Sequence, residues 1–230
     1  MSNSSHHLKA VGFLAKYFMN LTADEITGVY TISELMLLKA PYIVSIDGST
    51  TKTGIAVYDK KTGELVWHTV IAPKDKGRLT AKEKKGLTKQ ELKKKQTERC
   101  RQNMDMRIEE MIKAINRIFE RYQPQTIVME DTYAGKDMYA YKKLCQLQGL
   151  GLNYAIQNGV TFILKFPSSW RKDIGFPAYK KNGKNIQREE YKVMSKEYVK
   201  KKYGLDVSDD EADAICLGDS VIARCREVLQ

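Results

Sequence analysis

The sequence predicts an α/β domain built on a five-stranded mixed sheet, with helices on both faces of the sheet and a helical extension at the N-terminus. Apolar runs of strand length occur in the order of three strands, a helix, a strand, a helix and a strand, and further helices follow. The first three runs lie close together, which is typical of antiparallel neighbours. Helices separate the later runs, which is typical of parallel strands.

Residues 1–40 are predicted to form a helical arm ahead of the main domain, 41–230. Four apolar residues follow helical spacing: Leu14, Tyr17, Phe18 and Leu21. Thr22 and Glu25 have the pattern of a capping box. The apolar face of this arm needs a cover, which either the main domain or a second subunit could provide.

The strands of the main domain are predicted from five apolar runs: 42–47, 54–60, 64–72, 126–130 and 160–166. The turn Lys60–Gly63 joins the second and third strands as a hairpin. Apolar residues recur at helical spacing from Met106 to Phe119 and stop before Pro124. Further helices are predicted over about 137–157, 187–203 and 209–228.

Composition favours a soluble protein from a reducing compartment. None of the apolar runs approaches the roughly 18 residues that a membrane span requires, and the N-terminus lacks the pattern of a secretory signal. The four cysteines form no CxxC pair, which argues against a zinc ribbon or a disulfide framework.

The net charge of +11 is concentrated in two segments. Segment 74–101 holds 12 Lys and Arg against 4 Asp and Glu, and segment 165–202 holds the same numbers. Two basic stretches on an otherwise slightly acidic body indicate a polyanionic partner with a defined docking face, because binding phosphates releases condensed counterions. The alternative for either stretch is a solvated lysine-rich helix or loop.

Four carboxylates are predicted to form a metal site. Asp47 ends the first strand and Glu130 ends the fourth, where sites gather in sheets of this kind. Asp210 and Asp213 share one face of the last helix, which Ser208 and Glu211 are expected to cap. Carboxylate oxygens without nearby histidines suit Mg²⁺ or Mn²⁺ better than zinc. Two such ions could hold a phosphodiester for attack by water.

Three motifs in order resemble those of the RuvC-type Holliday-junction resolvases, which have the RNase H-like fold. IVSIDGSTTKTGIAVYD (43–59) is similar to the first strand pair, IVMEDTYAGKDMYAYKKLCQLQGL (127–150) to the second motif and DDEADAICLG (209–218) to the closing motif. The resemblance covers residues 42–226 and identifies Asp47, Glu130, Asp210 and Asp213 with the catalytic acids of the family.

The resemblance implies a homodimer that binds four-way DNA junctions and makes two symmetric nicks, leaving 5′-phosphates and 3′-hydroxyls, with two metal ions in each site. It matches Tyr133 to an aromatic residue that contacts bases; the alternative is a tyrosine in an interface or in the core. It also places three basic residues beside the scissile phosphate: Arg171, Lys172 and Lys192. Trp170, just before them, could belong to the core. In the basic insertion 74–101, six residues are expected to bind DNA: Lys82, Lys84, Lys85, Lys93, Lys94 and Lys95.

Two departures from compact bacterial members, the arm 1–40 and the long segment 74–101, leave the substrate range open to flaps, forks and other branched DNA. The rival functions are another RNase H-like nuclease, such as one that cuts RNA–DNA hybrids, an actin-like ATPase, and a catalytically silent DNA-binding scaffold. The expected location is the cytoplasm of a bacterial or phage-infected cell, with mitochondria or another DNA-containing compartment as alternatives.

Overall fold

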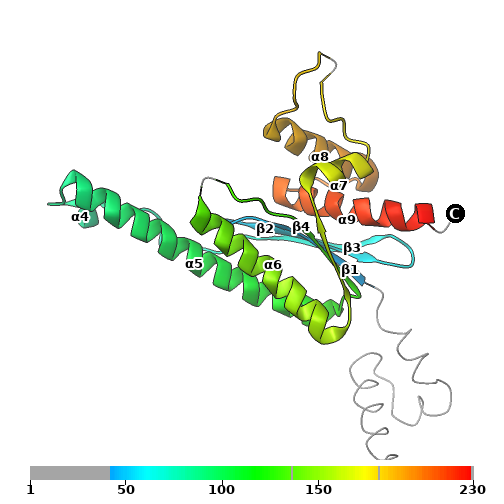
Figure 1. The fold of residues 1–230 in the computed structure, drawn as a ribbon, viewed down its shortest axis with the longest axis horizontal. Helices are drawn as coiled ribbons and strands as arrows, with labels where there is room; N and C mark the ends of the chain where they lie inside the picture. Colours follow the sequence, from blue (N-terminus) through cyan, green and yellow to red (C-terminus); the bar gives the residue numbers. More distant parts are fainter. Residues whose placement is uncertain (1–41, 136, 181, 229–230) are drawn as a thin grey trace, which may run out of the picture. The chain divides into compact units, whose positions relative to one another are not determined.

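The computed structural model describes residues 42–135, 137–180 and 182–228. The predicted arm 1–40 lies outside the described residues. The described part is an α/β unit with one five-stranded sheet between two layers of helices (Figure 1). No helix within the described ranges is long and apolar enough to span a membrane.

The sheet has the predicted mixed arrangement. Its strands are β1 (Tyr42–Gly48), β2 (Thr53–Asp59), β3 (Leu65–Ile71), β4 (Thr126–Glu130) and β5 (Thr161–Lys165). They lie in the order β3-β2-β1-β4-β5; β1, β2 and β3 are antiparallel neighbours, and β4 and β5 run parallel to β1. The predicted fold class is therefore confirmed, and the carboxyl ends of β1, β4 and β5 share one edge.

Helices cover the two faces of the sheet in separate groups (Figure 1). The helices are α4 (Ala81–Lys84), α5 (Lys89–Tyr122), α6 (Met138–Asn158), α7 (Pro167–Asp173), α8 (Arg188–Tyr203) and α9 (Asp209–Val228). Val44 and Ile46 of β1 pack with α5 and α6, whereas Ile43 packs with α7, α8 and α9. Because successive side chains of a strand point to opposite faces, this alternation also sets the direction of Asp47.

The helix α5 starts earlier than the apolar pattern predicted. It begins at Lys89, because the Thr88 hydroxyl accepts a hydrogen bond from the Glu91 backbone N–H and the Glu91 carboxylate accepts one from the Thr88 N–H. The pattern beginning at Met106 captured only the part of α5 that lies on the sheet. The short α7 was not predicted; it begins at Pro167, a residue suited to the first turn of a helix.

The helix α9 is seated directly on the sheet. Ser45 Oγ donates to the carbonyl of Ala214 at 2.7 Å, and the Tyr58 hydroxyl donates to that of Ile215 at 2.6 Å. A Cβ added to Gly54 would lie 1.8 Å from the Asp210 carbonyl oxygen, and one added to Gly218 would lie 2.3 Å from the Tyr58 ring. The two glycines therefore allow α9 and the sheet to approach more closely than residues with side chains at these positions would permit.

The close contact at Gly54 leads to a stability prediction. Gly54→Ala should lower the free energy of unfolding by about 2–3 kcal/mol, or prevent folding, because the added methyl group meets backbone atoms that cannot rotate aside. Gly149→Ala is the matched control, since its Cβ meets nothing within 4 Å on an exposed part of α6. The control should be neutral or gain up to about 1 kcal/mol. Denaturant unfolding measures both; equal midpoints for Gly54→Ala and wild type would contradict the described contact.

Candidate active site at the carboxylate edge of the sheet

Asp47 and Glu130 are neighbours at the carboxyl ends of adjacent parallel strands. The β1–β4 register pairs Ile46 with Met129, so the next residues along both strands are Asp47 and Glu130. Ser45 on β1 and Val128 on β4 both pack toward α9, and each lies two positions before one of these acids. Their side chains therefore point to the α9 face of the sheet.

The close seating of α9 brings Asp210 to the same place. In the β1–β2 register Asp47 lies opposite Gly54, and the backbone of Asp210 packs on Gly54. Asp213 follows one turn later, on the same side of α9 as Asp210. The predicted cap is present, because Ser208 Oγ accepts a hydrogen bond from the Glu211 N–H and donates one to the Glu211 carboxylate.

Electrostatics link the four carboxylates as one group. Burial raises the pKa of Asp47 well above its ordinary value, and the charges of Glu130, Asp213 and Asp210 raise this pKa further. Burial also raises the pKa of Glu130 and of Asp213. The structure thus brings together the four acids that the sequence placed at three distant points, and it makes their simultaneous ionisation costly.

Cationic and hydrogen-bonding side chains partly offset this cost. Trp170 Nε1 donates to Glu130 Oε2 at 2.8 Å, which lowers the pKa of Glu130. Arg171 lowers the pKa of both Glu130 and Asp213, and its guanidinium lies 4.9 Å from the Trp170 ring centre and 4.4 Å from that of Tyr191. Two aromatic rings therefore hold Arg171 beside the acids.

Two further cations act on the cluster. Lys192 lowers the pKa of Asp213 and forms an ion pair with Asp209 at 3.4 Å. Arg188, the first residue of α8, lowers the pKa of Asp47 and Glu130. Sequence reasoning did not single out Arg188. The capping pattern of Gln187 and Glu190 places Arg188 at the start of a helix, but it does not indicate that this helix end lies near the acids.

The remaining predicted DNA-contact residues are spread over the surface. Tyr133 is 77% exposed, so the alternative of a core tyrosine is excluded. Lys172 is exposed on α7, whereas Trp170 is fully buried and belongs to the core. The six predicted lysines of segment 74–101 lie on α4, α5 and the turn between them. Lys95 is half-buried and donates to the Glu83 carbonyl at 3.3 Å.

The donor set suits a hard divalent cation. Within the described ranges, no group of three or more His, Cys, Asp or Glu is already arranged to hold a metal ion. Yet Oδ1 of Asp213 is buried without a hydrogen-bond partner, and the repulsion among the four acids leaves a need for positive charge. Oxygen ligands of this type are the ones that Mg²⁺ and Mn²⁺ prefer. The residues present therefore fit such an ion.

Comparison with solved structures identifies the fold. T. thermophilus RuvC in complex with a Holliday junction substrate matches with a TM-score of 0.52 and 15% identity, over 81% of this chain and 96% of that one. A second Thermus thermophilus RuvC structure matches with a TM-score of 0.51 and 16% identity, over the same shares of the two chains. The yeast mitochondrial Holliday junction resolvase matches with a TM-score of 0.45 and 12% identity, over 96% of this chain and 95% of that one.

No protein-family model and no curated protein matches the sequence. The two RuvC structures therefore show a shared RNase H-like fold, and the predicted resemblance is confirmed at that level.

The raised pKa of Asp47 gives a prediction for stability. In the folded protein this pKa lies above its ordinary value of 3.8, so the folded state binds the proton more tightly than the unfolded chain. Stability should therefore fall as pH rises through the interval between the two values, and it should stay reduced above that interval. Asp47→Asn removes this charge and should melt a few degrees higher than wild type at neutral pH without divalent ions.

The difference between Asp47→Asn and wild type should shrink as pH falls toward the ordinary pKa. Calorimetry across this pH range measures it, with the exposed Asp206→Asn as the control. Added Mn²⁺ should raise the melting temperature of wild type more than that of Asp47→Asn, because a ligand stabilises the state that binds it. A variant less stable than wild type at neutral pH would contradict the buried charge assigned to Asp47.

Proposed function

We propose that this protein is a metal-dependent endonuclease that acts on branched DNA, with four-way junctions as its preferred substrate. The observation that carries the proposal is the convergence of Asp47, Glu130, Asp210 and Asp213 at the carboxyl edge of an RNase H-like sheet. The fold is that of RuvC, a protein whose structure is known with a Holliday junction substrate.

The four acids would hold one or two Mg²⁺ or Mn²⁺ ions. When bound, such ions lower the pKa of water and stabilise charge on the leaving oxygen. Hydrolysis then adds water to phosphorus and breaks the bond to the 3′ oxygen, which leaves a 5′-phosphate and a 3′-hydroxyl. No side-chain nucleophile is needed for this reaction.

The cationic residues around the acids orient the phosphate. Arg171 is held between Trp170 and Tyr191, so its position is fixed before DNA binds. Lys192 and Arg188 act on the cluster from α8, and they would neutralise the phosphate groups on either side of the bond that is cut. The hydrogen bond from the Trp170 indole to Glu130 offsets part of the effect of burial, which raises the pKa of Glu130.

The exposed Tyr133 suits contact with unpaired bases. It stands three residues beyond Glu130, and with 77% of its surface exposed its ring is available to bases. Stacking of a base on an aromatic ring contributes about 1–3 kcal/mol. Unpaired or strained bases occur at a branch point and not in a linear duplex, so Tyr133 favours branched DNA as the substrate.

A cleavage assay tests the proposed chemistry. Asp47→Asn should slow nicking of a synthetic four-way junction at least about a hundredfold, because it removes a carboxylate that would hold the metal ion. The dissociation constant for the junction should change little, since Asp47 faces the metal site and not the DNA backbone. The exposed Asp206→Asn is the matched control and should cut normally.

The same assay separates the rival functions. Cutting of a linear duplex or an RNA–DNA hybrid as fast as the junction would favour another RNase H-like nuclease, and binding without any nicking in Mg²⁺ or Mn²⁺ would favour a silent scaffold. Normal nicking by Asp47→Asn would refute the assignment of the site.

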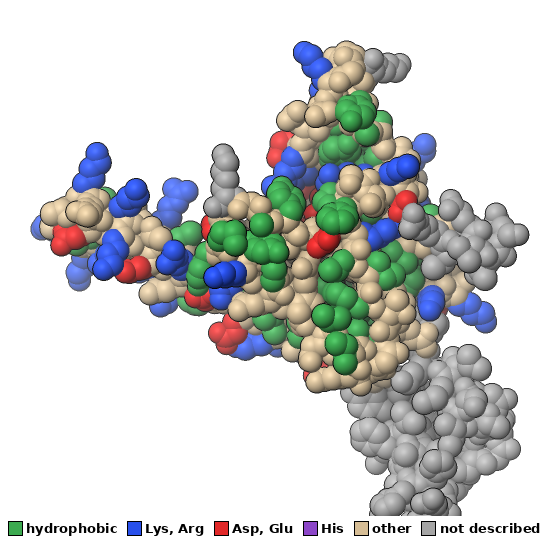
Figure 2. Space-filling view, in the orientation of Figure 1, with side chains coloured by type: hydrophobic (Ala, Val, Ile, Leu, Met, Phe, Trp, Pro, Cys, Tyr) green, Lys and Arg blue, Asp and Glu red, His purple; other side chains and the backbone are tan. Residues whose placement is uncertain are grey.

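A homodimer suits this function, because a two-fold junction presents two equivalent cleavage points. An exposed apolar surface could support it. Ile156 is 73% exposed and Leu152 is 46% exposed on the same side of α6, and Phe166 beyond the edge strand β5 is 58% exposed. Figure 2 shows hydrophobic side chains gathered on this face of the molecule. Such a patch is typical of an association surface.

The proposed dimer can be tested by changing this surface. Leu152→Lys with Ile156→Lys should convert a dimer into a monomer at micromolar concentration, because two charges would be buried at the contact. Light scattering coupled to size exclusion measures the mass. Gln157→Lys with Asn153→Lys, which exchanges exposed polar residues of the same helix, provides the control. A wild-type protein that is monomeric under these conditions would contradict the homodimer.

A further inference from the structure

The helix α5 extends well beyond the sheet, past the carboxyl end of β1. Its C-terminal residue Tyr122 packs on Tyr42 at the start of β1, with the ring centres 5.5 Å apart. Arg107 donates to the carbonyl of Thr50 at 2.8 Å, just after β1 ends. The helix thus follows β1 from its beginning to its end and then continues for another 18 residues to Lys89 (Figure 1).

One stripe of α5 changes character where the helix leaves the sheet. Residues at core-facing spacing from 104 onward are buried and apolar: Met104, Ile108, Met111, Ile115, Ile118 and Tyr122. The same alternating steps of three and four residues, continued toward the N-terminus, give Arg101, Thr97, Lys94 and Gln90, all exposed. Two more basic residues, Lys89 and Lys93, lie within about a quarter turn of this continued stripe.

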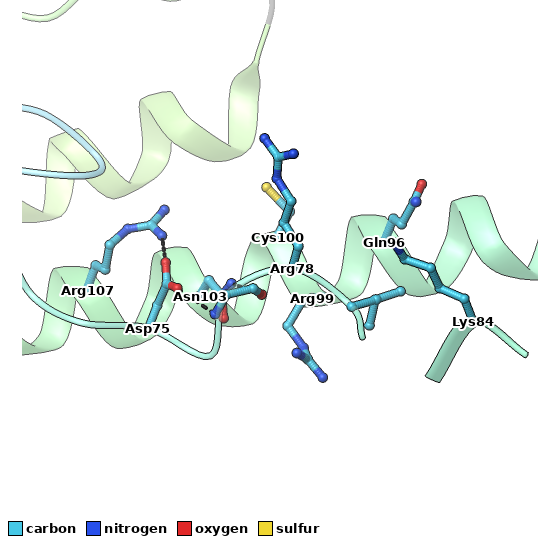
Figure 3. A pocket seen from close by; sticks show the side chains of 10 residues that line it. Asp75, Arg78, Lys84, Gln96, Arg99, Cys100, Asn103 and Arg107 are labelled. Carbon is cyan, nitrogen blue, oxygen red and sulfur yellow. Dashed lines mark hydrogen bonds and ion pairs between the residues drawn. The ribbon is translucent and has the colours of Figure 1, made fainter. Parts of the chain in front are cut away.

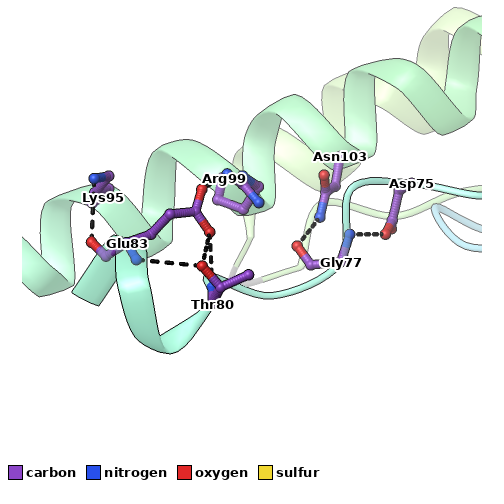
Figure 4. A network of polar contacts seen from close by, with 7 residues as sticks. All are labelled: Asp75, Gly77, Thr80, Glu83, Lys95, Arg99 and Asn103. Atoms are coloured by element: carbon purple, nitrogen blue, oxygen red, sulfur yellow. Dashed lines mark hydrogen bonds and ion pairs between the residues drawn. The ribbon is translucent and has the colours of Figure 1, made fainter. Parts of the chain in front are cut away.

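The opposite side of the extension is occupied by internal contacts. The Lys95 ammonium donates to the Glu83 carbonyl, and Arg99 forms an ion pair with the Glu83 carboxylate, which also caps α4 through Thr80 (Figure 4). Thr97 lies two residues from each of these basic residues, so it faces about 200° away from them. Lys95 and Arg99 therefore attach α4 to one side of α5. On the other side Arg101 lies 5.1 Å from the centre of the Tyr139 ring of α6, and the exposed Lys93 and Lys94 lie closer to the helix N-terminus.

The loop before α4 adds further support. Asn103 Nδ2 donates to the Gly77 carbonyl at 2.9 Å, and Arg107 forms an ion pair with Asp75 (Figures 3 and 4). A groove of about 590 Å³ runs between this loop and α5, and none of the four site carboxylates lines it. These contacts fix the direction of the extension, so its basic side keeps a constant position relative to the sheet.

We propose that the extension of α5, residues 89–101, is a docking surface for duplex DNA, and that its contact side is the basic continuation of the core-facing stripe. This inference rests on the proposed function and specifies which part of segment 74–101 contacts the substrate. The extension beyond Asn103 is about 20 Å long, which matches about six base pairs of duplex. The core-facing side of α5 points toward the sheet, so the same side of the extension points toward the space beyond the carboxyl ends of the strands, where one arm of a branched substrate would leave the site.

This geometry narrows the expectation that all six lysines bind DNA. Lys93 and Lys94 lie on or beside the continued stripe, whereas Lys95 is engaged with Glu83. Lys82, Lys84 and Lys85 belong to α4 and the turn after it, which are attached to the other side of α5. Their charges would attract DNA from a distance, whereas Lys93 and Lys94 would make the close contacts with phosphates.

Three charge-matched double variants of the full chain test the proposal. Lys93→Gln with Lys94→Gln changes the stripe, and Lys84→Gln with Lys85→Gln changes the other side of the extension. Lys60→Gln with Lys61→Gln changes an exposed pair in the β2–β3 turn, at the opposite edge of the sheet. Glutamine keeps a high helix propensity, so folding should be unaffected, and circular dichroism checks this.

Binding to a four-way junction is measured by fluorescence anisotropy with EDTA, so that no cleavage is needed. For the Lys93–Lys94 variant, the slope of log affinity against log salt should become shallower by about 1.8, because each lost phosphate contact removes about 0.9. Affinity at low salt should fall about tenfold. In the Lys84–Lys85 and Lys60–Lys61 variants, the salt slope and the affinity at low salt should each change by less than half as much.

The possible outcomes distinguish the docking surface from the proposed chemistry. If the Lys93–Lys94 and Lys84–Lys85 variants behave alike, or if neither differs from the Lys60–Lys61 variant, the docking surface is refuted while cleavage by wild type remains intact. If the Lys93–Lys94 variant alone loses affinity but wild type never nicks the junction, the docking surface stands and the nuclease proposal fails. Absence of DNA binding by wild type would overturn both.

Discussion

The direct contact between the backbone of α9 and the sheet is the constraint on which the candidate site depends. Side chains normally separate a helix from the sheet on which it packs, but Gly54 and Gly218 allow a closer approach here. Ser45 and Tyr58 then satisfy carbonyl groups in the middle of α9. As a result the first turn of α9 lies beside the end of β1. Asp210 and Asp213 could not share a site with Asp47 if α9 were displaced outward by the width of one side chain.

The site concentrates negative charge that the fold itself does not need. Burial and mutual repulsion raise the pKa of Asp47, and the nearby cations offset this only in part. Asp219, another buried acid of α9, accepts a hydrogen bond from the Tyr203 hydroxyl and forms an ion pair with Lys202. Asp213 differs from Asp219 in its surroundings, because burial and the charge of Asp210 raise the pKa of Asp213, whereas Asp219 has Lys202 at ion-pair distance.

The sequence predicted the strands well because their signal is local. All five runs were placed to within one residue at every boundary, and β4 agrees at both ends. The start of α5 was missed because Gln90, Lys94 and Thr97 carry no apolar signal, although the capping pair Thr88 and Glu91 marked it. Strand-end acids could be recognised from position alone. The hydrogen bond from Trp170 to Glu130 and the approach of Arg188 could not, since both depend on how α7 and α8 pack against the sheet.

The placement of positive charge follows from the same electrostatics. Cations in direct contact with all four acids would satisfy them and compete with a metal ion, so the cations near the cluster must be few and held in position. Arg171 fulfils this condition because two aromatic rings fix it, and Lys192 because Asp209 shares its charge. Further basic residues are on α5 beyond the sheet and in the last turn of α8. A polyanion is thus attracted over a wide area, whereas only the short stretch at the strand ends meets the carboxylates. In the proposed function, this separation would allow one surface to bind phosphates while another, a few turns of helix away, would repel them until a divalent ion reversed its charge.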